Sequence, residues 1–544
     1  MDLFNKNMNF LLVAINSKYI HSNPAVYSLK AYAGPEFEDC VSIAEYTINQ
    51  PIGRIMADIF SRKPDYIGFS CYIWNWKVVK ELLENIAKVL PNVGIFLGGP
   101  EVSYTDEHAF DEYKNILGIM RGEGEVTFKK LLTDLRDGKY AKTNISDLPN
   151  MDDLPFIYDL PGCDPAGNST CEAKESSKSL FADRIIYYES SRGCPFNCSY
   201  CLSAAEHGLR FRSIEKVLEH LDFFLERKVM QVKFLDRTFN ASHEHAMAIW
   251  KHIKENDNGV TNFHFEIAAD IMTEDEIGII SSMRPGLVQL EIGVQSTNPK
   301  TLEAVNRKSD IEKIAEVTER LISAHTAHVH LDLIAGLPFE DLESFKKSFN
   351  DLFAMKPNQL QLGFLKVLKG APIDSQTKKY GIEYMSEPPY EVLRTDWLGY
   401  DDIIKLKRVE EVLEIYYNSA QFTCSLPYLI DFFDTPFDFF DRLGEFFERK
   451  GYFVSTPARA RRYDILLEFL GEKEDAYLGG ASVPSDVIVE ELRAKLTFDY
   501  YIREKPKSKP AFVNKLPEGV EFDYEHRDPI TYNATVKNHT NLLL

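Results

Sequence analysis

The chain has few cysteines, an excess of negative charge and no long apolar run. Eight cysteines in 544 residues are too few for a disulfide scaffold and suit a reducing compartment. No apolar stretch approaches about 18 residues, the usual length of a transmembrane helix. The 62 basic and 83 acidic residues give a net charge of −21, which disfavours a broad nucleic-acid footprint. Because the first residues also lack the features of a secretory signal, we expect a cytoplasmic protein without membrane contacts.

The pattern of apolar residues divides the chain into four parts. Residues 1–140 alternate short apolar strands with amphipathic helices, which predicts an α/β domain with a doubly wound parallel sheet. Residues 183–370 repeat this alternation six times at a longer period, as expected of a partial (β/α)6 barrel. Residues 141–182 are proline-spaced and polar, so we expect a mobile linker. Residues 371–544 are predicted to be a mainly helical extension of unknown function.

The predicted strands have definite positions in both α/β parts. In the first domain they are residues 9–15, 40–44, 66–70, 94–97 and 116–120, with helices at 25–32, 52–60, 76–90 and 125–136. In the barrel they are residues 184–190, 231–235, 263–268, 287–294, 329–334 and 359–365. Ligands of both folds bind at the carboxyl ends of the strands, so the loops after these strands are the candidate sites.

Three cysteines crowd into eight residues directly after the first barrel strand. Cys194, Cys198 and Cys201 stand in the sequence RGCPFNCSYC. Three thiolates can hold a [4Fe–4S] cluster and leave its fourth iron open for a reaction. A zinc site with His207 as the fourth ligand, or a set of unpaired thiols, is the alternative.

The spacing C-x3-C-x2-C resembles the signature of the radical S-adenosylmethionine (SAM) enzymes. In that family the open iron chelates SAM, and its reductive cleavage yields a 5′-deoxyadenosyl radical. The segments LEIGVQS and DLIAGLPFE match further strand ends of these enzymes, but the usual Gly-Gly-Glu is absent where this chain has KFLDRTFN. The resemblance implies SAM contacts from Phe196, Tyr200, Glu291, Gln295, Ser296 and Arg307, with Asp236 or Glu266 as candidates for the SAM amino group. Capping a helix or pairing with an arginine is the alternative role for these carboxylates.

The first domain resembles the cobalamin-binding module that is joined to many radical SAM enzymes. The matching segments are GFSCYIWNW, FLGGPEVSY and MRGEGEVTFKKLL. The better-known module carries Asp-x-His-x-x-Gly, of which only His21 is present, so a loop hydrogen bond is the alternative to cobalt ligation. Trp74 can cover the corrin or pack in the core. The implied cobalamin contacts are His21, Ser70, Tyr72, Trp74, Gly98, Gly99, Pro100, Glu101, Gly122 and Glu123.

The two resemblances cover roughly residues 8–370 and together imply a cobalamin-dependent radical SAM enzyme. Its cofactors would be a [4Fe–4S] cluster, SAM and cobalamin, with a one-electron reductant such as flavodoxin or ferredoxin as partner. The implied reaction methylates an unactivated carbon through cobalamin. A cyclisation or rearrangement without methyl transfer and a non-catalytic corrinoid sensor are the alternatives. A small molecule, a peptide and a modified nucleotide all remain open as substrates.

Overall fold

The computed structural model describes residues 8–160, 163, 165, 181, 184–205, 208–472, 485–504 and 512. The chain forms two compact units. The first comprises Met1–Leu290, Val305–Arg307 and Leu365–Val392, and the second comprises Glu291–Ala304, Lys308–Phe364 and Leu393–Leu544. The predicted first domain and the first half of the predicted barrel therefore lie in one unit.

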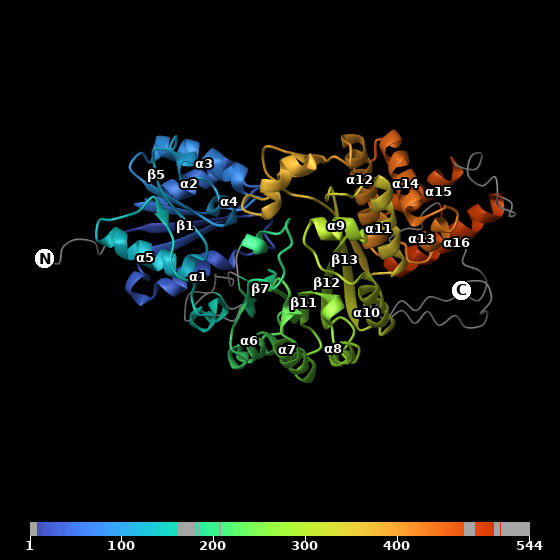
Figure 1. The fold of residues 1–544 in the computed structure, drawn as a ribbon, viewed down its shortest axis with the longest axis horizontal. Helices are drawn as coiled ribbons and strands as arrows, with labels where there is room; N and C mark the ends of the chain where they lie inside the picture. The colour runs from blue at the N-terminus through green and yellow to red at the C-terminus, as the bar shows by residue number, and fades with distance from the viewer. Residues whose placement is uncertain are drawn as a thin grey trace. The chain divides into compact units, whose positions relative to one another are not determined.

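The first unit begins with a parallel α/β domain, drawn in blue and cyan in Figure 1. Its sheet has the strand order β2-β1-β3-β4-β5-β6. The strands are β1 (Phe10–Asn16), β2 (Val41–Thr47), β3 (Tyr66–Ser70), β4 (Gly94–Gly98), β5 (Ile116–Met120) and β6 (Thr143–Asn144). The five predicted strands are confirmed, and the sixth, of two residues, comes from the segment that was predicted to be a linker.

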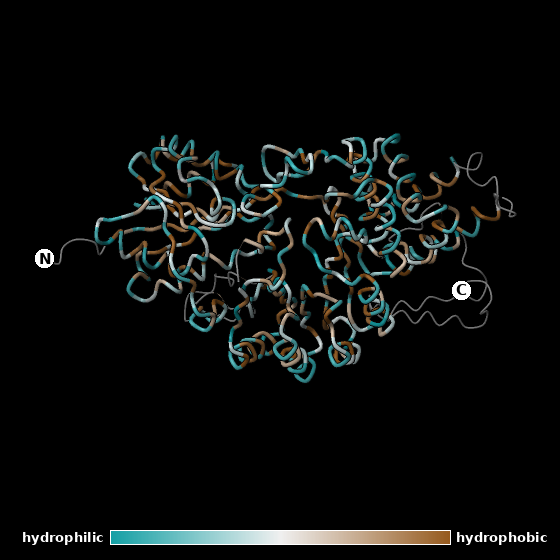
Figure 2. The backbone as a smooth tube through the Cα atoms, in the orientation of Figure 1, coloured by the Kyte–Doolittle hydropathy of each residue, from teal (hydrophilic) through white to brown (hydrophobic). Residues whose placement is uncertain are grey.

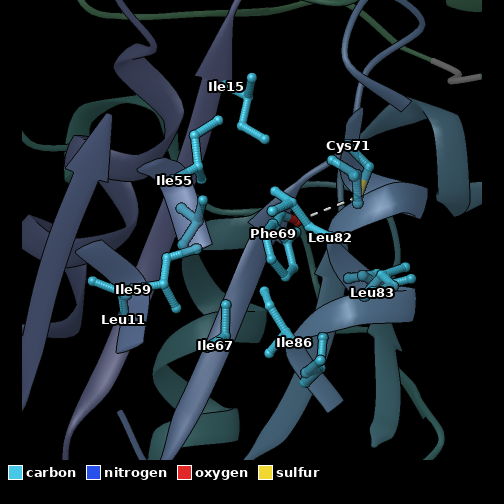
Figure 3. Packing of buried hydrophobic residues seen from close by; sticks show 14 of the residues in the cluster. Leu11, Ile15, Ile55, Ile59, Ile67, Phe69, Cys71, Leu82, Leu83 and Ile86 are labelled. Carbon is cyan, nitrogen blue, oxygen red and sulfur yellow. Dashed lines mark hydrogen bonds between the residues drawn. The ribbon is translucent and has the colours of Figure 1, made fainter. Parts of the chain in front are cut away.

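Helices cover both faces of this sheet: α1 (Pro24–Ala33), α2 (Ile52–Arg62), α3 (Trp76–Val89), α4 (Pro100–Ser103) and α5 (Gly124–Arg136). Side chains alternate between the two faces along β1. Leu11 and Ile15 pack with Ile55 and Ile59 of α2 in one buried cluster, which Figure 3 shows. Phe10 points to the opposite face, where its ring lies 5.1 Å from that of Phe128 on α5. In Figure 2 the tube is mainly brown along the central strands of this sheet.

The second sheet carries the barrel strands in the order β14-β13-β12-β11-β10-β7. They are β7 (Ile186–Tyr188), β10 (Gln231–Phe234), β11 (Asn262–Ile267), β12 (Val288–Gln295), β13 (Ala327–Ala335) and β14 (Gln359–Phe364). All six predicted barrel strands are thus confirmed. The sheet has two ends, at β7 and β14, as expected of a barrel that does not close. The helices after the strands are α6 (Ile214–Glu226), α7 (His243–Glu255), α8 (Glu274–Ile280), α9 (Pro299–Ala304), α10 (Ile311–Ser323) and α11 (Leu342–Ala354).

The end of the second unit is helical, as predicted for the extension. Its helices are α12 (Tyr400–Leu413), α13 (Ser425–Ile430), α14 (Pro436–Lys450), α15 (Arg461–Gly471) and α16 (Ser485–Arg503). Phe437, Phe439 and Phe440 of the aromatic run on α14 are fully buried, so this run belongs to the core of the unit. Among the described residues, no helix combines the length and apolarity needed to span a membrane.

The predicted linker is described up to residue 160, and this part is packed against the first unit. Met151, Leu154, Ile157 and Tyr158 are buried. The Tyr158 hydroxyl donates a hydrogen bond of 2.6 Å to the carbonyl of Tyr187 on β7. The apolar side chains between the prolines are thus anchors, and the expectation of a mobile crossing is wrong for this part. Of residues 161–182, all but 163, 165 and 181 lie outside the described residues.

Candidate active site

A cavity of about 760 Å³ lies in the first unit, at the carboxyl ends of strands from both sheets. Loops after β1, β3, β4 and β5 line it from the first sheet, and residues after β7 and β10 line it from the second. The segment Leu365–Val392 adds Leu368 and Lys369. Parallel strands present their following loops at one edge, so ligands of both α/β parts meet in this cavity.

The cavity collects every residue predicted to contact cobalamin. These are His21, Ser70, Tyr72, Trp74, Gly98, Gly99, Pro100, Glu101, Gly122 and Glu123. It also reaches the cysteine motif from both sides, through Gly193 before Cys194 and through Leu202 and Ser203 after Cys201. The predicted SAM contacts do not line it. The corrinoid crevice and the cysteine loop are therefore neighbours on one wall.

Gly99 makes the floor of the crevice at the end of β4. Its backbone has φ 105° and ψ 171°, a conformation that essentially only glycine adopts. A Cβ atom on Gly99 would lie 2.5 Å from the carbonyl oxygen of Cys71, so the two loops touch backbone to backbone. Glycine at this position therefore allows the loops after β3 and β4 to pack together at the edge of the cavity.

Substitution of Gly99 tests this floor. Gly99→Ala is expected to lower the free energy of unfolding by about 1–3 kcal/mol, because alanine is strained in this conformation and clashes with Cys71. It should also weaken corrinoid binding by at least roughly tenfold, measured by absorbance titration with hydroxocobalamin. Gly53→Ala is the control, because Gly53 on α2 is exposed and a Cβ there meets nothing within 4 Å. Equal corrinoid affinities of the two variants would contradict the assignment.

Aromatic side chains form another part of the wall. The rings of Tyr72 and Trp74 stack at 4.3 Å and 10°. The Trp74 indole donates to the carbonyl of Ile15 at 3.3 Å while its side chain stays 45% exposed. The nearby Trp76, the first residue of α3, is buried in the core. Trp74 is thus the tryptophan available to a ligand.

His21 links the two α/β parts of the unit. Its Nδ1 lies 2.6 Å from the hydroxyl of Tyr187, and its backbone forms a parallel bridge with Ile185. Burial lowers the pKa of His21, and Lys18 and Lys233 lower it further, so the imidazole is neutral near pH 7. The hydrogen bond that the sequence offered as the alternative role is present. Ligation of cobalt by His21 stays a prediction.

Arg192, next to the cysteine motif, is surrounded by carboxylates. Its guanidinium contacts Glu123, Glu125 and Glu189, each at 2.8 Å, and its side chain is 17% exposed. Glu123 also pairs with Arg210. Burial acts to raise the pKa of Glu125, but Arg192 outweighs it and holds that pKa below the ordinary value. The network joins the start of α5 to the strand that leads into the cysteines.

A pair of short antiparallel strands, β8 (Ser191–Arg192) and β9 (Arg210–Phe211), closes the loop that carries the cysteines. At its base, a Cβ atom on Gly193 would lie 1.9 Å from the carbonyl oxygen of Gly208. Within the loop, the Cys201 amide donates to the Cys198 carbonyl at 3.0 Å. Cys198 is buried, and Cys194 and Cys201 are partly buried. Three thiols on one tied loop fit the three protein-bound corners of a [4Fe–4S] cluster.

The zinc alternative stays a prediction. The described part of the chain contains no group of three His, Cys, Asp or Glu side chains arranged to hold a single metal ion, the three cysteines included. Zinc draws its thiolates to about 2.3 Å from one centre, whereas a four-iron cluster spreads them over separate irons. His207, the fourth ligand considered for zinc, lies outside the described residues.

Arg307 lies against the cysteine motif. Its Nη1 is 3.1 Å from the Tyr200 hydroxyl and 3.5 Å from the Cys198 sulfur. Burial raises the pKa of Tyr200 well above its usual range, although Arg307 acts to lower it, so the phenol stays protonated. The Arg307 guanidinium therefore lies in contact with a predicted cluster ligand. Contact of Phe196, Tyr200 and Arg307 with SAM stays a prediction.

Asp236, a candidate for the SAM amino group, is buried and fully engaged. It accepts hydrogen bonds from the Ser190 amide and hydroxyl at 3.0 and 2.5 Å, and from the Ser191 hydroxyl at 2.6 Å. Burial raises its pKa to about 6, with the serines acting against burial. Asp236 therefore fastens the chain between β7 and the cysteine loop. Glu266, the second candidate, stays a prediction.

Three predicted SAM contacts, Glu291, Gln295 and Ser296, belong to the second unit. Glu291 and Gln295 lie on β12, and Gln295 has a positive φ of 74°. Ser296 is buried and donates a hydrogen bond of 2.6 Å to Glu340. Glu340 accepts a second one from Ser348 at 2.9 Å. The Ser296 hydroxyl thus has a structural partner, and its contact with SAM stays a prediction.

Glu340 predicts a pH dependence of stability. Burial raises its pKa from the ordinary 4.5 to about 7, against the two serine hydroxyls. The folded state therefore keeps a proton that the unfolded state loses, so stability is full below pH 4.5 and falls as the pH rises to 7. The loss is of the order of 2–3 kcal/mol. Glu340→Gln should abolish this fall in denaturant unfolding at pH 5 and pH 8, and Glu343→Gln, at a side chain 79% exposed, should retain it. Parallel profiles of Glu340→Gln and wild type would refute the assignment.

Several wall residues carried no recognisable signal in the sequence. Arg192 and Glu189 flank a recognised motif and pair with each other locally, but the other partners of Arg192, Glu123 and Glu125, are 69 and 67 residues away in the chain. Lys369 pairs at 3.1 Å with the buried Glu101, across more than 250 residues. Tyr390 also donates to Glu101. The position of Arg192 next to the cysteine motif could have indicated its place at the site. No sequence motif indicated the contacts of Lys369 or Tyr390 with Glu101.

Three family models match successive parts of the chain. Residues 11–132 match the B12 binding domain, residues 188–352 match the radical SAM superfamily, and residues 378–539 match a protein family of unknown function, DUF4080. The last match covers most of the helical extension.

Known proteins resemble the chain at low identity. The cobalamin-dependent radical SAM methyltransferase TokK of Streptomyces tokunonensis is 26% identical over 64% of this chain and 54% of its own. The hopanoid C-3 methylase of Methylococcus capsulatus is 26% identical over 52% and 55%, respectively. The chain spans about half the length of the curated relatives it matches.

Solved structures share the fold. TsrM of Kitasatospora setae, a radical SAM methyltransferase solved with cobalamin and a [4Fe–4S] cluster, has a TM-score of 0.53 at 14% identity, covering 71% of this chain and 82% of that one. OxsB, a cobalamin-dependent SAM radical enzyme, has a TM-score of 0.57 at 15% identity, covering 91% and 81%. The chain thus combines an N-terminal part that matches the B12 binding domain with a following part that matches the radical SAM superfamily, and the cysteine loop of the second lies beside the crevice of the first.

Proposed function

We propose that this protein is a cobalamin-dependent radical SAM enzyme that methylates an unactivated carbon of its substrate. The observation that carries the proposal is the single cavity lined both by Gly98 and Gly99 of the crevice and by Gly193 and Ser203 beside the cysteines. A substrate in this cavity contacts both cofactor sites. The relatives TokK and the hopanoid C-3 methylase are named for methyl transfer, which favours this reaction over the alternatives.

The chain's own residues hold and orient the reactants. When bound, the cluster with SAM supplies hydrogen abstraction, and cobalamin supplies a methyl group. Cys194, Cys198 and Cys201 hold the cluster and leave one iron for SAM. Arg307 contacts Cys198, and Asp236 fixes the chain that leads into the loop.

The crevice residues complete the arrangement. Gly99 allows the loops after β3 and β4 to pack together at the edge of the crevice, and Trp74 offers an exposed ring to the corrinoid. The hydrogen bond between His21 and Tyr187 connects the crevice to β7, which precedes the cysteine loop. These contacts keep the two sites in a fixed relation, which radical transfer between bound groups requires.

The proposal also covers the electron donor, the cellular compartment and the class of substrate. The reaction consumes electrons one at a time, so a flavodoxin or a ferredoxin is the expected donor, in the cytoplasm. The expected substrate is a small molecule, a peptide or a modified nucleotide.

The proposal is tested with SAM that carries a deuterated methyl group. The reconstituted protein, a reductant and a filtered small-molecule cell extract should yield a product that contains the intact labelled methyl, together with S-adenosylhomocysteine and 5′-deoxyadenosine. A new product without label, formed with 5′-deoxyadenosine alone, would replace methyl transfer by cyclisation or rearrangement. Corrinoid binding without either nucleoside would indicate a sensor.

A further inference from the structure

A side pocket of about 280 Å³ adjoins the main cavity. The two share wall residues from the first sheet and from the entrance to the cysteine loop: Ser103, Tyr104, Gly122, Glu123 and Gly193. The side pocket adds Arg121, Ile145, Leu148, Gly208 and Arg210. All of these residues belong to the first unit, and the proposed reaction has given this pocket no role.

Positive charge prevails on the walls of the side pocket, although the chain as a whole has a net charge of −21. Its two guanidinium groups, of Arg121 and Arg210, face one carboxylate, Glu123. Arg210 pairs with Glu123, which also pairs with Arg192 at 2.8 Å. Glu123 is therefore paired with two other arginines, Arg210 and Arg192, and in the described part of the chain it forms no ion pair with Arg121.

Arg121 lacks a carboxylate partner in the described part of the chain. Its Nη2 donates to the carbonyl of Thr105 at 2.7 Å, which fixes one edge of the guanidinium. Its Nε is buried and has no hydrogen-bond partner among the described residues. Arg121 also lines the side pocket, and an anion with two oxygens fits the fork of a guanidinium that has no carboxylate partner.

Apolar side chains line the same pocket. Ile145 and Leu148 are 65% and 55% exposed, and the ring of Tyr104 is also exposed. Gly122 and Gly208, both at positive φ, leave open space on the wall, because a Cβ on either would meet nothing within 4 Å. Exposed apolar surface beside a cation in a concave site is typical of binding to an amphipathic small molecule.

We propose that the side pocket binds an anionic group of the substrate, a carboxylate or a phosphate, whose adjoining part is apolar. Arg121 is the residue that selects the anion, and Ile145 and Leu148 contact the apolar part. The inference rests on the proposed function in one respect: a ligand held here extends past Gly193 into the cavity where the reaction takes place.

The test uses two fluorescent probes with the same aromatic rings, on the full chain loaded with corrinoid. 8-Anilinonaphthalene-1-sulfonate carries an anion, and N-phenyl-1-naphthylamine does not. Arg121→Gln should weaken binding of the sulfonate roughly tenfold and leave the neutral probe unchanged. Leu148→Ser should weaken both. Arg54→Gln, on the exposed face of α2, should change neither. Equal effects of Arg121→Gln on both probes, or no effect, would overturn the proposal.

A second arm separates a substrate anion from the phosphate of the cobalamin tail. Cobalamin carries this phosphate, and cobinamide lacks it. Arg121→Gln should bind both corrinoids as wild type does. Loss of affinity for cobalamin alone would assign Arg121 to the cofactor and overturn the proposal. Probe binding needs no SAM cleavage, so failure of 5′-deoxyadenosine formation with the expected probe results would reject the proposed reaction and not the pocket.

Discussion

Replacement of Cys194, Cys198 and Cys201 together by alanine is expected to abolish iron binding and the formation of 5′-deoxyadenosine. The three thiolates are the predicted ligands of the cluster, and the sequence between Gly193 and Leu209 contains no other cysteine, so the variant cannot bring SAM to an iron. Iron content after anaerobic reconstitution should fall to background, and the nucleoside, measured by mass spectrometry, should fall below detection. Corrinoid binding should persist, because the crevice lies on other loops.

Two other cysteines provide matched controls. Cys40 directly precedes β2 of the first sheet, and Cys424 lies in the second unit. Both side chains are only partly buried. Alanine at either position should leave iron content and nucleoside formation at the wild-type level. Retained iron and activity in the triple variant would refute the assignment of the cluster to this loop.

Replacement of Arg192 by methionine is expected to have the second largest effect. The guanidinium is the shared partner of Glu123, Glu125 and Glu189, and its removal leaves mutually repelling carboxylates in a partly desolvated site. Breaking a buried ion network in this way costs about 3–5 kcal/mol of the free energy of unfolding. Because Arg192 leads directly into Gly193 and Cys194, the variant should also bind the cluster less completely.

The pH dependence of the stability loss in Arg192→Met tests the role of this ion network more specifically than the size of the loss does. The pKa of Glu125 is held below its ordinary value in the folded protein, so its contribution is present at neutral pH and lost as the pH falls through that pKa. The difference in stability between wild type and Arg192→Met should therefore shrink below about pH 4.5. Denaturant unfolding at pH 7 and pH 4 measures it.

Arg62→Met is the control for Arg192→Met. Arg62 forms an exposed pair with Asp58 on α2, with side chains 39% and 41% exposed. Exposed pairs contribute about 0–1 kcal/mol, so this variant should lie close to wild type at both pH values. An Arg192→Met variant as stable as Arg62→Met would show that the network does not hold the loop.

The sequence predicted the secondary structure and the crevice well for a physical reason. Each predicted strand is a short segment rich in apolar residues and bounded by turn residues, and each crevice loop follows such a strand directly. The local pattern therefore determines both the strand and the position of its loop. All ten crevice residues line one cavity because parallel strands end at one edge.

The charge contacts of the site could not be predicted in the same way. Asp236 was a candidate for the SAM amino group, and that contact stays a prediction, but nothing local predicted that its carboxylate accepts from Ser190 and Ser191, some 45 residues earlier in the chain. Arg192 meets Glu123 and Glu125 across a longer separation, of 69 and 67 residues. Such pairings depend on how separate elements pack, and neither periodicity nor propensity carries that information. The prediction of a mobile linker failed at residues 151–158, where apolar side chains are buried. There the local pattern was misleading, because the prolines around these side chains are typical of a loop.

Reductant-dependent formation of 5′-deoxyadenosine tests the central claim most directly. The full chain is purified without oxygen, reconstituted with iron, sulfide and cobalamin, and incubated with SAM and a chemical reductant. The structure predicts that iron and corrinoid are bound by the same molecule and that the nucleoside accumulates when the reductant is present and not without it. A protein that contains both cofactors, yet produces no 5′-deoxyadenosine under reducing conditions, would contradict the assignment of this site to radical SAM chemistry.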